Sequence, residues 1–175
     1  MSYFLESSIA EFKKYKGLGD KAIAQLHTDD EMHWKPSAES NSMAIIIKHL
    51  YGNMLSRWTD FLTTDGEKPD RKRDGEFLED RETKAQLLEL WETGWKCMFD
   101  ALTPLKEENL MQTVMIRSEP HTVMLAIIRQ ISHYCSHIGQ MIYLAKQIRD
   151  ADWQTLSVPR GKSEEFNQMM MEKGK

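Results

Sequence analysis

Apolar residues recur at steps of three and four along most of this chain, and this spacing restricts its fold more than any other feature. Four segments follow the helical period: residues 3–26, 42–62, 83–102 and 121–149. The pattern is loosest in the first segment. The last segment is apolar on most sides, which is typical of a helix buried among others. The spacing therefore predicts an all-α fold with four long helices.

Three connections separate these helices. Residues 27–41 are polar and contain Pro36, and Ser40 or Asn41 is the expected cap of the following helix. Residues 63–81 are charged and too long for a tight turn, so we expect a crossover along a bundle between the second and third helices. Residues 105–120 are mixed, with a short extended piece expected at 113–117. This layout predicts a four-helix bundle over residues 1–152, followed by a tail at 153–175 with room for a short helix.

Charge and composition argue against several classes of function. The formal net charge is −4, whereas a general nucleic-acid binder needs a basic surface. The densest basic cluster, residues 71–73, is flanked by Asp70 and Asp74. No uncharged run reaches the roughly 18 apolar residues of a membrane span, and no secretory leader is recognisable. Two cysteines, Cys97 and Cys135, do not make a disulfide framework. We therefore expect a cytoplasmic protein without nucleic-acid or membrane partners.

Two histidines in the last helix suggest a metal site. His133 and His137 are four residues apart, so both rings lie on one face of the helix. Two imidazole nitrogens can then meet one ion at about 2.0–2.1 Å. His49, in the middle of the second helix, is the candidate third ligand. An unpaired buried imidazole costs about 1–3 kcal/mol, which either a metal or ordinary hydrogen bonds could offset. The spacing alone leaves both alternatives open.

Four neighbours of these histidines have more than one interpretation. Asn53 and Gln140 lie within one turn of His49 and His137, so they could contact the ligands, line a cavity or form hydrogen bonds at the core edge. Gly52 and Gly139 lie inside helices, where glycine costs about 1 kcal/mol relative to alanine. They could allow close helix approach, leave room beside an ion, or simply be tolerated. No general base is evident.

The other three histidines are expected outside the site. His27 and His33 lie in the first connection, where we expect them to face solvent or to line the mouth of the bundle. His121 follows Pro120 at an expected helix start, where the helix dipole disfavours a charged imidazole. The connections 27–41 and 105–120 are expected to line the mouth.

At the histidines the sequence resembles the DinB superfamily of bacterial proteins. The resemblance covers most of the chain up to about Lys146, and residues 57–69 resemble one subgroup of that superfamily. Its most specific parts are the runs Ile47-Lys48-His49-Leu50-Tyr51-Gly52-Asn53-Met54 and His133-Tyr134-Cys135-Ser136-His137-Ile138-Gly139-Gln140. The resemblance implies an up-down-down-up four-helix bundle, often as a homodimer. It also implies a divalent ion, commonly zinc or nickel, held by His49, His133 and His137.

Three functional hypotheses follow. The first is a metal-dependent enzyme acting on a small-molecule substrate, either a hydrolase or, as in some similar proteins, an S-transferase that uses a low-molecular-weight thiol. The second is a non-catalytic, metal-stabilised bundle that acts as a dimeric interaction module. The third is a metal-free bundle with hydrogen-bonded histidines. Spacing identifies neither the substrate nor the metal, because three imidazoles suit several transition metals.

Overall fold

The structure is a computed structural model that describes residues 2–173, and the chain is mainly helical. The long helices are α1 (Tyr3–Ala24), α3 (Met43–Trp58), α4 (Lys84–Leu102) and α5 (Val123–Arg149), and the short ones are α2 (Asp29–His33) and α6 (Ser163–Lys173). Single turns of 3-10 helix form at η1 (Arg73–Phe77), η2 (Glu107–Asn109) and η3 (Asp150–Asp152). Strands β1 (Thr113–Ile116) and β2 (Glu119–Thr122) pair antiparallel, with Thr113 opposite Thr122.

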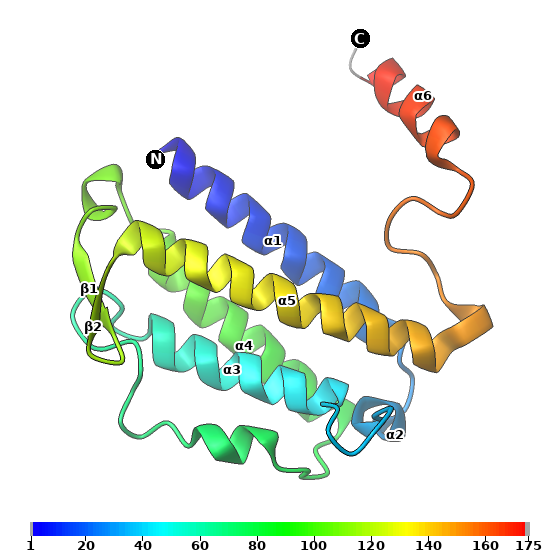
Figure 1. The fold of residues 1–175 in the computed structure, drawn as a ribbon, viewed down its shortest axis with the longest axis horizontal. Helices are drawn as coiled ribbons and strands as arrows, with labels where there is room; N and C mark the ends of the chain where they lie inside the picture. Colours follow the sequence, from blue (N-terminus) through cyan, green and yellow to red (C-terminus); the bar gives the residue numbers. More distant parts are fainter. Residues whose placement is uncertain (1, 174–175) are drawn as a thin grey trace.

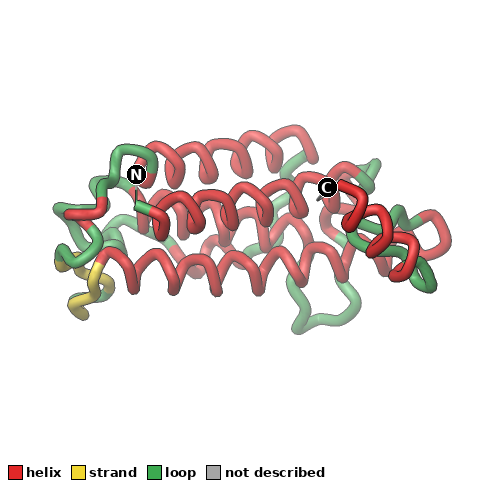
Figure 2. The backbone as a smooth tube through the Cα atoms, turned by 90° about the horizontal axis from the view of Figure 1, so that it is seen from above, coloured by secondary structure: helices red, strands yellow, loops and turns green. Residues whose placement is uncertain are grey.

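The four long helices lie side by side around a single core (Figures 1 and 2). Helix α1 packs against α5 and α3 packs against α4, while α3 also contacts α5 and α1 contacts α4. Figure 1 shows α1 and α5 running in one direction and α3 and α4 in the opposite direction. The β-hairpin closes the end of the molecule at which α5 begins.

Local chemistry sets the helix ends, and some differ from the sequence expectation. Helix α3 is capped by Ser42, whose Oγ accepts from Ile45 N–H, so the prediction of Ser40 or Asn41 was wrong. The helix stops at Trp58 rather than residue 62, and Asp60 just beyond it has a positive φ of 49°. Helix α5 begins at Val123, because residues 119–122 pair with β1 and Thr122 provides the cap.

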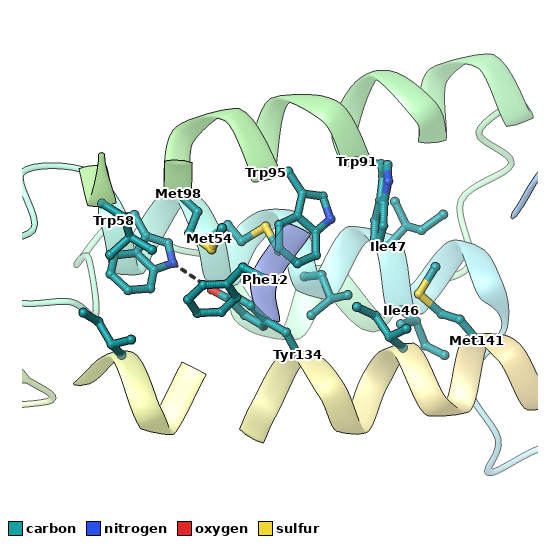
Figure 3. Packing of buried hydrophobic residues seen from close by; sticks show 14 of the residues in the cluster. Phe12, Ile46, Ile47, Met54, Trp58, Trp91, Trp95, Met98, Tyr134 and Met141 are labelled. Carbon is teal, nitrogen blue, oxygen red and sulfur yellow. Dashed lines mark hydrogen bonds between the residues drawn. The ribbon is translucent and has the colours of Figure 1, made fainter. Parts of the chain in front are cut away.

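Aromatic side chains from all four long helices fill the centre of the core. Phe12, Trp58, Trp95 and Tyr134 meet there at ring-centroid distances of 5.7–6.5 Å (Figure 3). The indole N–H of Trp58 donates to the Tyr134 hydroxyl at 2.9 Å, and that hydroxyl donates to Asn53 Oδ1 at 3.1 Å. The buried hydroxyl is thus satisfied between two helices that bear the site.

One side of α5 is more open than its composition predicts. Leu125 is 53% exposed and Ile128 is 44% exposed, so the prediction of a helix covered on most sides was wrong for this face. No helix within residues 2–173 has the length and apolar character needed to cross a membrane.

The crossover between α3 and α4 lies along α3 and is tied to it. The Lys48 ammonium donates to the carbonyl of Leu78 at 2.8 Å and pairs with Glu82 at 3.1 Å. Further along, Gly66 N–H donates to Met115 O in the β-hairpin at 2.8 Å. The charged crossover therefore covers one side of α3, and it carries side chains to the histidines.

Candidate metal centre

His49, His133 and His137 come together on facing surfaces of α3 and α5. The Nε2 atom of His133 lies 3.2 Å from Nε2 of His49 and 3.1 Å from Nε2 of His137. His49 is only 6% exposed, because the crossover covers the outer side of α3. The three side chains offer ligand atoms within 4.8 Å of one another and could hold one metal ion.

The crossover supplies a carboxylate that orients His49. The Nδ1–H of His49 donates to Glu76 Oε2 at 2.9 Å, which leaves the lone pair on Nε2 facing the other histidines. Arg71 holds the same carboxylate through two bonds, Nε to Oε1 at 2.7 Å and Nη2 to Oε2 at 2.8 Å. Burial raises the pKa of Glu76, but the hydrogen bonds from His49 and Arg71 outweigh it and lower that pKa. Glu76 is therefore ionised in the folded protein.

Gly52 provides the space for this carboxylate. A Cβ built at Gly52 would lie 2.7 Å from Glu76 Cδ, which is closer than real Cβ contacts come. Of the three interpretations of this glycine, the structure supports room beside the site, and the Glu76 side chain occupies that room. Gly139 differs, since a Cβ there would meet no atom within 4 Å.

Gln140 plays the corresponding part for His137. The Nδ1–H of His137 donates to Gln140 Oε1 at 3.1 Å, so its Nε2 lone pair also faces the cluster. Gln140 thus contacts a predicted ligand. Asn53 forms no hydrogen bond to a histidine of the described residues, and its Oδ1 accepts from the Tyr134 hydroxyl.

Burial favours the neutral imidazole at two residues of the cluster, His133 and His137. Burial, followed by the neighbouring His137 and His49 and then Arg57 and Arg71, lowers the pKa of His133 to about 3. Burial and His49 also lower the pKa of His137. A neutral imidazole is the form that binds metals, so these two side chains do not have to lose a net proton to become ligands.

The nitrogen spacing fits a shared cation. Ligands at about 2.0–2.1 Å in tetrahedral geometry lie about 3.3 Å apart, close to the 3.1 and 3.2 Å distances here. Without a cation, His133 Nε2 can donate its single hydrogen to only one of two facing lone pairs. The other contact then places two nitrogen lone pairs at hydrogen-bond distance from each other, which is repulsive. A metal ion that accepts both lone pairs would remove this repulsion.

A family model described as "Protein of unknown function (DUF1572)" matches residues 1–162. The chain belongs to this family. All three histidines and Glu76 lie within the matched residues. No curated protein and no solved structure gives a significant match.

The other histidines of this DUF1572 protein lie outside the cluster. His27 is exposed, and Nε2–H of His33 donates to Glu82 O at 2.8 Å. His121 lies in strand β2, not at a helix start, because the hairpin continues to Thr122. Its Nδ1–H donates to Glu119 O at 3.0 Å.

Sequence reasoning missed Glu76 and Arg71. Both belong to a charged crossover that looks like solvated surface, yet their side chains are only 10% and 5% exposed. A helical glycine three residues after His49 was the only signal, and it pointed to space without naming what fills it.

Proposed function

We propose that this DUF1572 protein is a metal-dependent enzyme of the DinB superfamily, with His49, His133 and His137 as ligands to zinc or nickel. The arrangement of α1, α3, α4 and α5 supports the up-down-down-up bundle of that superfamily. The observation that carries the proposal is the orientation of the rings: Nδ1 of His49 and His137 is engaged outside the cluster, and Nε2 of both faces His133.

The proposed reaction is transfer of a thiolate, or hydrolysis, on a small molecule. A divalent ion bound by three imidazoles would leave a position open and lower the pKa of a water or thiol placed there. The chain's own residues fix the ligands: Glu76, held by Arg71, orients His49, and Gln140 orients His137. Asn53 borders the same cavity as His49 and His133, where it can contact a substrate.

Metal content tests the proposal. The protein is purified without added metal, reconstituted with zinc or nickel, and analysed by elemental analysis beside His133→Ala and His121→Ala. We expect about one ion per chain in the wild type and in His121→Ala, and a large loss in His133→Ala. Equal stoichiometry in all three proteins, each shown to be folded by circular dichroism, would count against the site.

A second candidate function is a metal-stabilised interaction module that forms a homodimer. The observation in its favour is the apolar exposure of α6, where Met170 is 50% exposed and Met171 is 71% exposed. This candidate predicts a dimer by analytical ultracentrifugation and a fall in melting temperature on chelation. Turnover of a low-molecular-weight thiol with an electrophile, dependent on His133, would favour the enzyme instead.

A further inference from the structure

A cavity of about 240 Å³ opens beside the histidines, and arginines dominate its wall. His49 and His133 form one part of it, together with Asn53 and Gln130. The remaining residues come from α3, the crossover, the tip of the β-hairpin and α5: Arg57, Arg71, Arg73, Arg117 and Arg129. Segments far apart in the sequence thus bring five arginines to the wall of one small cavity.

Arg57 is buried in this wall without adequate partners. Its residue is 3% exposed, and its Nε and Nη1 atoms have no hydrogen-bond partner among residues 2–173. The nearest carboxylate contact is Glu67 Oε2, 4.0 Å from Nη2. Burial lowers the pKa of Arg57, and so do the charges of Arg129 and Arg71, yet an arginine stays protonated in proteins. A buried cation with free donors is costly unless an anion meets it.

The fold makes specific room for Arg57. A Cβ at Gly66 would lie 2.5 Å from Arg57 Nη1 and 3.0 Å from its Cδ, so a side chain at Gly66 would displace the guanidinium. Ser56 fixes this segment, because its Oγ donates to Gly66 O at 3.0 Å and accepts from Lys68 N–H at 2.9 Å. The position of Arg57 is therefore built into the packing of the crossover on α3.

The tip of the β-hairpin, at the exposed rim of the cavity, is also held in place. Asp65 accepts from the backbone N–H groups of Arg117 at 2.8 Å and Ser118 at 2.7 Å. These bonds hold a hairpin tip in which both residues have positive φ, 55° and 62°. Arg129 lies one helical turn before His133, on the same side of α5.

Carboxylates only partly neutralise these arginines. Glu67 lies 3.3 Å from both Arg71 and Arg117, and Glu76 is occupied by Arg71 and His49. Arg129 forms no ion pair within the described residues. The buried Gln130 Oε1 also lacks a partner there, so the wall offers one free acceptor among many donors.

We infer that this cavity binds an anionic group of the substrate, a carboxylate or phosphate oxyanion, and so places the rest of the molecule against the histidines. The inference rests on the proposed function. Guanidinium groups suit this task because their fork matches two oxygens of a carboxylate or phosphate. The cavity is smaller than the roughly 300–1,000 Å³ of drug-sized pockets, which points to a small acid.

Calorimetric titration of the full chain, metal-loaded and metal-stripped, tests the inference with three probes: inorganic phosphate, malonate and the neutral malonamide, at matched ionic strength. We expect phosphate or malonate to bind and malonamide not to bind. Tighter binding of phosphate would indicate a phosphoester substrate, and tighter binding of malonate would indicate a carboxylic acid. Equal binding of malonamide, or no binding of either anion, would overturn the inference.

Arginine variants locate the binding. Arg129→Gln removes an exposed guanidinium and should weaken anion affinity roughly tenfold, as expected for one charge-assisted hydrogen bond. The matched control is Arg160→Gln, which removes an exposed arginine outside the cavity and should leave affinity unchanged. Arg57→Lys keeps the charge but loses the fork and should weaken binding at least as much. Equal affinity in Arg129→Gln and Arg160→Gln would contradict the assignment, even if Arg57→Lys fails to fold.

Metal content measured on the same samples separates the two proposals. Arg129→Gln should retain about one ion per chain, so its weaker anion binding cannot come from a lost histidine site. A wild-type protein that binds metal but no anion would refute the cavity assignment alone. A protein that binds anions but no metal would refute the proposed function and leave anion binding in place.

Discussion

At the scale of single residues, the histidine cluster depends on a carboxylate from another part of the chain. Glu76 fixes the tautomer of His49, while Arg71 keeps that carboxylate ionised and in place. Partners of this kind raise ligand basicity and hold the ring in position. The ligands alone therefore do not define the site.

Replacing Glu76 with glutamine should weaken metal binding by about 10–100-fold without unfolding the protein. The amide keeps the shape but has no negative charge to attract the His49 Nδ1–H. Competition with a chromogenic chelator measures the affinity, and Glu89→Gln, an exposed change on α4, is the control. An affinity for Glu76→Gln equal to that of Glu89→Gln would show that the carboxylate has no such role.

The Asp65 carboxylate holds the tip of the β-hairpin, and its contribution to stability can be tested by changing the pH. Burial raises the pKa of Asp65, but backbone N–H groups of Glu67, Ser118 and Arg117 outweigh it and hold that pKa below its ordinary value. The unfolded chain then binds the proton more readily, so the stabilisation is present above pH of about 3.9 and is lost as pH falls through the folded pKa.

Asp65→Asn should consequently lower the melting temperature near pH 7 by about 2–4 °C, as expected for a loss of about 1 kcal/mol. The difference from wild type should shrink as the pH falls below about 4. Thermal unfolding by circular dichroism across this range measures it. A difference that stays constant with pH would contradict an ionic anchor.

At the scale of secondary structure, two helical glycines that each follow a histidine of the cluster differ in what surrounds them. Gly52 on α3 faces the Glu76 carboxylate, whereas Gly139 on α5 faces open space. Helix propensity favours alanine at both positions. Only the neighbouring element distinguishes them.

The variants Gly52→Ala and Gly139→Ala should therefore differ in their effect on metal affinity. Gly139→Ala should stabilise the protein by about 1 kcal/mol and leave metal affinity unchanged. Gly52→Ala should displace the Glu76 side chain and weaken metal binding, because His49 loses its partner. Melting temperature and chelator competition measure both effects, and equal metal affinities would refute the role assigned to Gly52.

At the scale of the whole molecule, the four long helices and the crossover form the body that carries the site, and the last helix stands apart from it. Trp153 and Leu156 pack against the core, whereas the described residues of α6 are all exposed (Figure 1). Residues up to about 156 thus account for the buried core.

Truncation after Arg160 should leave the melting temperature within about 1 °C of the full chain, because surface changes without buried contacts have small effects. Metal stoichiometry should also be unchanged. The same truncation tests the second candidate function, since dimerisation through α6 would be lost while the monomer stays folded. A large fall in melting temperature would show that α6 stabilises the body.

The sequence determined the parts that depend on local period and spacing. Apolar steps of three and four located the long helices, and the four-residue spacing of His133 and His137 put both rings on one face. The third histidine was found because it lies in the middle of the second apolar segment. These signals are contained within single helices, so they can be read without knowing how the helices pack.

Only the tertiary structure decided which polar side chains join the site. Glu76, Arg71 and Arg57 are charged residues whose types predict exposure, and they are buried because the crossover folds onto α3. Residues 121–122 likewise left the expected helix, because residues 119–122 pair with β1. The energy of a buried charge or of a strand edge depends on the partner that the fold places beside it, and the apolar period of a single helix does not contain that partner.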